Sequence, residues 1–374
     1  MYQGMAAQDL YERMQEISEN TMDWVVPSNK VEARFQTDMG KRVGYRWLQE
    51  TKNPIQNPPI LQNHLLPEEI PSASMYGSID SNADAQLATK LGIPKTYYDR
   101  MAKEAPGLWD SNCNHWLENL NKPIMLRTWV NSQGRRAVRA ILSNAYSRMD
   151  NLEIFKTVLP ILQEQPEMKI VSGYVNEHKF YLKVVFPRVQ GDVGLNDIVQ
   201  SGLNIMNSET GQGAFKIQPL TYRLVCLNGM IIPDASLRKT HLGSRIEVGQ
   251  DIDWRNETIA ADDKATLMKI QDITRQATDE SRFKYIVEQL KDSAERTIDV
   301  SKSEQVRILA KKESLSEQET DTILEFLMKS DGNSHWDLAN AVTSAAGKAA
   351  DYEQATNLET LGGRIVTTPE LLAA

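Results

Sequence analysis

The order of the predicted elements is the feature that most limits how this chain folds. Alternating strand patterns occupy the middle of the 374 residues, and amphipathic helical patterns occupy both ends. Runs of strands followed by runs of helices are typical of α+β proteins and differ from alternating βαβ folds. We therefore predict an α+β fold. Its central antiparallel β-sheet carries a basic hairpin, and N-terminal helices and a C-terminal helical region flank the sheet.

Changes in composition along the chain predict three regions. Residues 1–80 hold an opening helix and a linker with five prolines between residues 52 and 72, and proline interrupts both helices and sheet ladders. Residues 81–250 form a strand-rich core domain that begins with helices. Residues 251–374 follow as a C-terminal helical region.

Charge is distributed unevenly along the chain, whose formal net charge is −8. From residue 251 to residue 374, 15 Lys and Arg stand against 24 Asp and Glu, whereas residues 119–149 carry six basic residues and no acidic one. A basic middle beside an acidic C-terminal half predicts a localised surface that binds anions.

The basic stretch coincides with a predicted hairpin, residues 124–130 and 136–143, joined by a loop that ends in glycine. Arginines beside aromatic rings suit single-stranded nucleic acid, because cations meet phosphates while rings stack on bases. The candidate contacts in and after the hairpin are Arg127, Trp129, Arg135, Arg136, Arg139, Tyr146 and Arg148. A second cluster could extend the same groove: Lys216, Tyr222, Arg223, Arg238 and Lys239. The alternative is that Trp129 is a core residue and that the arginines pair with acids of the C-terminal half.

No motif for catalysis or for a cofactor is present. The chain lacks GxSxG, a Walker A loop, HExxH and a Rossmann fingerprint, so we expect no enzyme and no cofactor. Cys113 and His115 are the one close Cys/His pair, too few ligands for a zinc site, so no metal is expected. The absence of a long apolar run and of a signal peptide predicts a cytoplasmic protein without a membrane span.

A second interpretation concerns residues 84–104. Ala88, Gly92, Ile93 and Tyr98 occupy the positions at which a helix-turn-helix has its small residue, turn glycine and apolar anchors. This pattern would make the protein a regulator that reads duplex DNA. Two helices that only pack together would show the same pattern.

Several segments also carry a family resemblance: LATKLGIPKTYYDRM, NHWLEN, RAVRAILSNAYSRMDN, LTYRLVCLNGM and DYEQATNLETLGGRIV. In this order they resemble a family of phage and plasmid proteins catalogued as a domain of unknown function, number 932. The resemblance implies a mobile-element origin and a bacterial cytoplasm.

These observations lead to one main hypothesis and two rivals. We expect a phage or mobile-element protein that forms a homo-oligomer and binds single-stranded DNA, as strand-annealing recombination proteins do. The rivals are the duplex-binding regulator and a non-enzymatic protein-binding or assembly factor of a phage.

Overall fold

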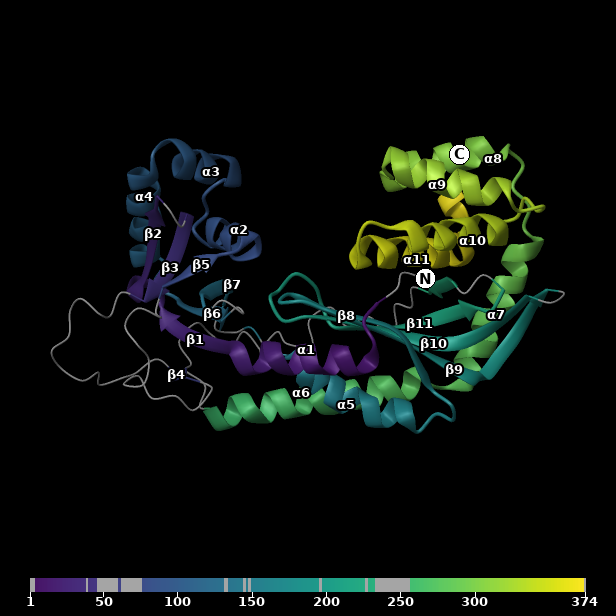
Figure 1. Cartoon of the computed structure of the whole chain (residues 1–374), viewed down its shortest axis with the longest axis horizontal. Coiled ribbons are helices and arrows are strands. Elements are labelled where there is room, and N and C mark those ends of the chain that lie inside the picture. Colours follow the sequence, from purple (N-terminus) through teal and green to yellow (C-terminus); the bar gives the residue numbers. More distant parts are fainter. Residues whose placement is uncertain are drawn as a thin grey trace.

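The computed structural model describes residues 4–37, 40–45, 60–61, 76–130, 134–143, 146, 149–194, 197–225, 228–232 and 256–372. Figure 1 shows two sheets one after the other along an elongated molecule, each with its own group of helices, and long helices along the base. The predicted α+β class, with N-terminal helices and a C-terminal helical region, is confirmed.

The first sheet has seven strands in the order β2-β3-β5-β7-β6-β1-β4. Their bounds are β1 Thr21–Pro27, β2 Val31–Gln36, β3 Gly40–Tyr45, β4 Ile60–Leu61, β5 Tyr76–Ile79, β6 Pro123–Val130 and β7 Arg136–Ser143. Neighbouring strands are antiparallel except for the parallel pair β5–β7. The predicted hairpin is therefore β6–β7, but β1 and β5 flank it on either side. The expected boundary at residue 80 does not separate two sheets, because strands from both sides of it pair directly.

Three helices cover one face of this sheet: α2 Ser81–Lys90, α3 Lys95–Glu104 and α4 Pro106–Asn119. The Asp80 side chain caps α2 by accepting a hydrogen bond from the backbone N–H of Ala83. Gly92 ends the helix at a φ of 65°, a left-handed conformation that favours glycine. Trp109 and Tyr98 are completely buried against the sheet, so aromatic packing holds the helices in place.

The second sheet has five strands, all antiparallel, in the order β12-β11-β10-β9-β8. The strands are β8 Lys169–Val175, β9 Lys179–Gly194, β10 Asp197–Ser208, β11 Lys216–Arg223 and β12 Asn228–Ile231. The basic hairpin is not part of this sheet. The predicted single central sheet is thus two sheets, and the arginine-rich strands lie at the junction between them.

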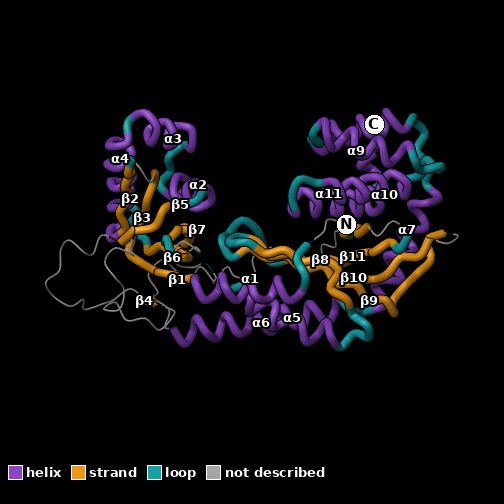
Figure 2. The backbone as a smooth tube through the Cα atoms, in the orientation of Figure 1, coloured by secondary structure: helices purple, strands orange, loops and turns teal. Residues whose placement is uncertain are grey.

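One face of the five-stranded sheet is apolar and is covered by three helices: α1 Ala7–Asn20, α5 Asn151–Gln163 and α6 Asn256–Ala277. Completely buried residues such as Leu182, Val184 and Leu203 line this face. Burying each such side chain contributes about 1.5–3 kcal/mol relative to exposure. The three helices run along the base of the molecule in Figure 2.

The remaining helices form a C-terminal unit beside the other face of the same sheet. They are α7 Glu280–Glu295, α8 Lys302–Glu313, α9 Glu317–Met328, α10 His335–Ala345 and α11 Tyr352–Thr367. Small residues allow α10 and α11 to approach closely, since a side chain at Gly362 would collide with Thr343. This unit brings α11 over the sheet, where Glu359 of the helix contacts Lys183 of β9.

Candidate functional site

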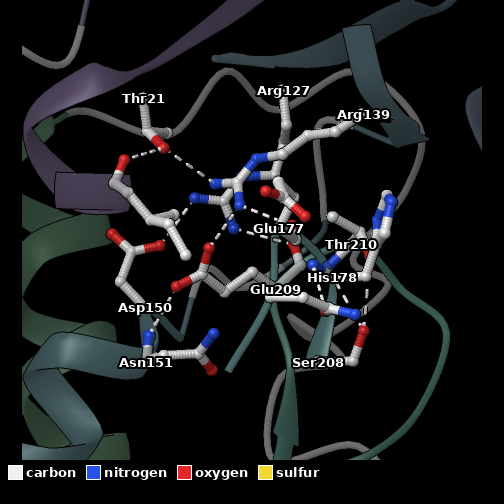
Figure 3. Close-up of polar contacts among 12 residues, drawn as sticks. Thr21, Arg127, Arg139, Asp150, Asn151, Glu177, His178, Ser208, Glu209 and Thr210 are labelled. Carbon is white, nitrogen blue, oxygen red and sulfur yellow. Dashed lines mark hydrogen bonds and ion pairs between the residues drawn. The ribbon is translucent and has the colours of Figure 1, made fainter. Parts of the chain in front are cut away.

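The predicted arginines lie where the two sheets meet. Strand pairing in β6–β7 sets Arg127 opposite Ala140 and Thr128 opposite Val138, which leaves Arg139 as the extra residue of a bulge. A bulge redirects the side chain at its extra residue. Arg127 and Arg139 therefore both reach toward the tip of the five-stranded sheet, as Figure 3 shows.

Arg127 is completely buried, and each of its guanidinium nitrogens has a partner. Nε donates to Asp23 Oδ1 at 3.0 Å, Nη2 donates to Asp150 Oδ1 at 2.6 Å, and Nη1 donates to the backbone carbonyl of Glu209 at 2.8 Å. The pKa of Arg127 is raised well above its usual value, because the attraction of these carboxylates outweighs its loss of hydration.

Arg139 is also completely buried. Its Nη1 donates to Glu209 Oε2 at 2.6 Å and to the carbonyl of Glu177 at 2.8 Å. The other oxygen of Glu209 accepts a hydrogen bond of 2.7 Å from the backbone N–H of Asn151, where α5 begins. The carboxylate of Glu209, directly after β10, thus links β7 to the start of a helix, where a negative charge is favoured.

These contacts correct the expectation of an open row of arginines. Neither guanidinium reaches the surface, and their acidic partners come from residues 23, 150 and 209 and not from the C-terminal half. Removing one partner of such a buried ion pair is strongly destabilising. We conclude that Arg127 and Arg139 join the two sheets. Sequence reasoning missed their partners because these acids lie outside the acid-free stretch.

A histidine adds a second link at the same junction. His178 Nε2 lies 3.1 Å from Asp80 Oδ2, and its Nδ1 lies 3.2 Å from Thr210 Oγ1. An acid, a histidine and a hydroxyl in series resemble the arrangement that activates a nucleophile. Thr210 is completely buried, however, so its hydroxyl cannot meet a substrate. The series connects β5 and α2 to the five-stranded sheet.

The other residues predicted around the hairpin are placed differently. Trp129 is partly exposed and lies under the Arg13 guanidinium, 5.7 Å from the ring centroid. Arg136 donates to Thr128 Oγ1 at 2.8 Å, and burial lowers its pKa. Arg135 is exposed. The hydroxyl of Tyr146 donates a hydrogen bond to the backbone carbonyl of Ser208 at 3.1 Å. The predicted contacts Arg148, Arg238 and Lys239 lie outside the described residues.

Of the second predicted cluster, Arg223 is already engaged inside the molecule. Its Nε and Nη2 donate to the two carboxylate oxygens of Asp197 at 2.6 and 2.7 Å, and its guanidinium lies 5.5 Å from the Trp336 ring. Lys216 and Tyr222 are partly exposed. The structure therefore separates this cluster into one internal ion pair and two surface residues.

Lys216 and Tyr222 belong to the face of the five-stranded sheet opposite the apolar one, which we call the polar face. Strand register places on it Ser172, Tyr174, Tyr181, Lys183, Val185, Gly202, Asn204, Met206, Lys216, Gln218, Leu220 and Tyr222. The residues Tyr174, Met206, Lys216, Gln218 and Tyr222 are partly exposed. Tyrosines and lysines on a sheet surface provide rings and positive charge side by side.

The covered part of the polar face contains a buried charge pair that sequence reasoning missed. Lys183 of β9 donates to Glu359 of α11, and both side chains are completely buried. Burial raises the pKa of the Glu359 carboxyl, although the Lys183 ammonium opposes this shift. Asn204, opposite Lys183 on β10, is buried with no hydrogen-bond partner for either amide atom among the described residues. A lysine inside the otherwise apolar segment 180–186 was the available signal.

The helix pair α2–α3 packs onto the first sheet through Ala88, Ile93 and Tyr98, as its helix-turn-helix pattern requires. Two of the three basic residues of α3 are engaged with acids nearby, and the third, Lys103, is exposed. Lys95 pairs with Asp99 at 2.5 Å, and Arg100 pairs with Glu104 at 2.8 Å. This pairing leaves the second helix with little net positive charge for a duplex.

Two further properties concern the described part of the chain. It contains no group of three or more His, Cys, Asp or Glu side chains arranged to hold a metal ion. Cys113 is a buried free thiol, and Cys226 lies outside the described residues. None of the helices described there is both apolar enough and long enough to cross a membrane.

Comparison with known proteins gives one match. The family described as "Domain of unknown function (DUF932)" matches residues 139–362, a span that includes the polar face, α11 as far as Gly362 and much of the junction. No curated protein and no solved structure matches the chain. Because the matched span exceeds half of the 374 residues, the chain belongs to the DUF932 family.

Proposed function

We propose that this protein binds single-stranded DNA on the polar face of its five-stranded sheet. The observation that carries the proposal is the alternation on β11, where Lys216, Gln218 and Tyr222 share one face and are all partly exposed. Tyr174 of β8 and Met206 of β10 extend this surface across the sheet. Sheets commonly bind single strands in this way, since exposed rings stack on bases and cations meet phosphates.

The proposal differs from the sequence hypothesis in its residues. Arg127, Arg139 and Arg223 hold the fold together through carboxylates and are not assigned to DNA. Lys216 and Tyr222 are retained as contacts. Trp129, Arg135 and Arg136 lie near the loop of the hairpin and are not assigned to the polar face.

The biological setting is part of the same proposal. We place the activity in the cytoplasm of a bacterial cell that carries a phage or plasmid, and we assign it to a homo-oligomer that anneals complementary strands. Light scattering with the full chain tests the oligomer. A mass of one chain, 42.3 kDa, would contradict it.

Fluorescence anisotropy with a labelled oligothymidylate tests the binding. Each phosphate contact should contribute about −0.7 to the slope of log affinity against log salt. Lys216→Ala/Tyr222→Ala should weaken binding at least tenfold, because stacking alone contributes about 1–3 kcal/mol per base.

A matched control removes the same two residue types elsewhere. Lys284 and Tyr285 are exposed on α7, so Lys284→Ala/Tyr285→Ala should leave the affinity unchanged. Absence of binding at low salt, or equal affinities for both double variants, would overturn the proposal.

A further inference from the structure

Part of the polar face is covered by α11, and the covering residues have an unusual chemistry. The ring of Tyr352 lies parallel to that of Tyr174, with centroids 5.4 Å apart and an angle of 14° between the planes. The centroid of the Tyr181 ring lies 5.2 Å from the centroid of the Tyr352 ring. The Tyr352 hydroxyl is within 2.8 Å of Ser172 Oγ. An aromatic ring from α11 is thus stacked on Tyr174 and lies tilted, at 40°, against Tyr181.

Two turns further along α11, Glu359 places a carboxylate on the ammonium of Lys183. The same ammonium lies 4.6 Å from the centroid of the Tyr352 ring. A stacked ring and an anion therefore meet the sheet side by side. These are the two chemical groups, base and phosphate, that a nucleotide would present to the same residues.

Buried polar atoms without hydrogen-bond partners, next to Lys183, support the comparison of Tyr352 and Glu359 with a nucleotide. Both amide atoms of Asn204 and Oε1 of Glu359 are buried without a hydrogen-bond partner among the described residues. Leaving such atoms unpaired is unfavourable, because they lose their hydration and gain no partner. Asn204 faces this region from β10, directly opposite Lys183. A base edge carries both donors and acceptors, which an asparagine amide can match.

We propose that Tyr174, Tyr181, Lys183 and Asn204 form a nucleotide subsite, which Tyr352 and Glu359 of α11 fill in the unbound protein. The strand bound on Lys216 and Tyr222 extends into this subsite when α11 is displaced. The tyrosines stack on a base, Lys183 meets a phosphate, and Asn204 contacts the edge of the base. This inference rests on the proposed function and adds to it a site that the helix and the DNA compete for.

Hydrogen exchange on the wild-type protein tests the competition without any substitution. Saturating oligothymidylate should speed amide exchange in residues 352–360, because α11 leaves the sheet. Unchanged or slower exchange there, with the oligonucleotide bound, overturns the subsite while the proposed function stands. Failure of the oligonucleotide to bind at all overturns both.

Substitution gives the second test. Tyr352→Ala removes the ring that fills the subsite, so the affinity for oligothymidylate should rise at least threefold. Adding Lys183→Met to that variant should abolish the gain in affinity. Adding the control substitution Tyr285→Ala instead, at an exposed site, should leave the gain in affinity unchanged. Circular dichroism confirms that each variant is folded. An affinity of Tyr352→Ala equal to or below that of the wild type, in a folded protein, contradicts the proposal.

Discussion

The molecule contains two clusters of buried charge that differ in how completely their polar atoms are partnered. In the junction, Arg127 has a partner on every guanidinium nitrogen, and both oxygens of Glu209 are occupied. Of these two side chains and Arg139, only the Nε of Arg139 is buried without a partner among the described residues. Under α11, Glu359 Oε1 and the whole amide of Asn204 are unpartnered among the described residues. A buried charge is tolerated when it is paired and hydrogen-bonded. We therefore assign a stabilising role to the junction and the proposed subsite to the cluster under α11.

The largest expected effect concerns the junction. Arg127→Ala leaves Asp23 buried without its cation, so the free energy of unfolding should fall by about 3–5 kcal/mol. Urea unfolding followed by circular dichroism measures this change. Arg135→Ala, at an exposed position of the same hairpin, should change stability by no more than about 0.5 kcal/mol. Similar losses in the free energy of unfolding for the two variants would mean that the buried ion pairs of the junction do not hold the two sheets together.

The second prediction addresses the pair under α11. Lys183→Met should lower the free energy of unfolding by about 3 kcal/mol, because the Glu359 carboxyl then lacks its cation. Lys183→Met/Glu359→Leu should recover most of that loss, since apolar residues often replace a buried pair without cost. A double variant as unstable as the single one would show that the pair itself stabilises the contact between α11 and the sheet.

Two buried asparagines on β10 allow a direct comparison, because the amide of one has no hydrogen-bond partner in the described part of the chain and the amide of the other has two. Asn204→Leu should raise the free energy of unfolding by about 1 kcal/mol, because it removes two unsatisfied atoms. Asn207 donates to the carbonyl of Met149 and to Asn151 Oδ1, both at 2.8 Å, so Asn207→Leu should lower stability by about 1–3 kcal/mol. Thermal unfolding measures both. Loss of stability in Asn204→Leu would reveal a partner for its amide.

The smallest expected effect is the pH dependence of the cluster under α11. Burial raises the pKa of Glu359 in the folded protein, so the folded state takes up this proton at a higher pH than the unfolded chain. The resulting stabilisation is complete below the unfolded value of about 4.3 and declines as pH rises through the raised value. Compared with Glu359→Gln, the wild type should therefore lose stability from acidic to neutral pH. A constant difference between the two would contradict the raised pKa.

The sequence predicted local structure well where periodicity decides it. The hairpin β6–β7 was recognised from alternation and turn residues, and the helix pair α2–α3 from its apolar spacing and turn glycine. The division into two sheets was not predictable in this way, because β1 pairs with β6 about a hundred residues further along the chain. Local patterns do not encode which distant strand becomes the neighbour.

The side-chain contacts of the site were not predictable from local sequence patterns either. Alternation assigns Arg139 to a face, but the bulge at that residue changes the assignment, and its partner Glu209 is 70 residues away. An acid-free stretch of sequence therefore does not establish a positive surface. The charge of Lys183 within an apolar strand was a local signal of a buried pair, although its partner Glu359 lies 176 residues further on.

Photo-crosslinking tests the central claim that the polar face of the five-stranded sheet binds DNA. A bromodeoxyuridine-substituted oligonucleotide is irradiated with the full chain, and mass spectrometry identifies the attached residues. We expect crosslinks to Tyr222 and Tyr174, and fewer of them in the Lys216→Ala variant. Crosslinks confined to Trp129 and Tyr146 at the hairpin, or no crosslinks with the strand in excess, would contradict the account.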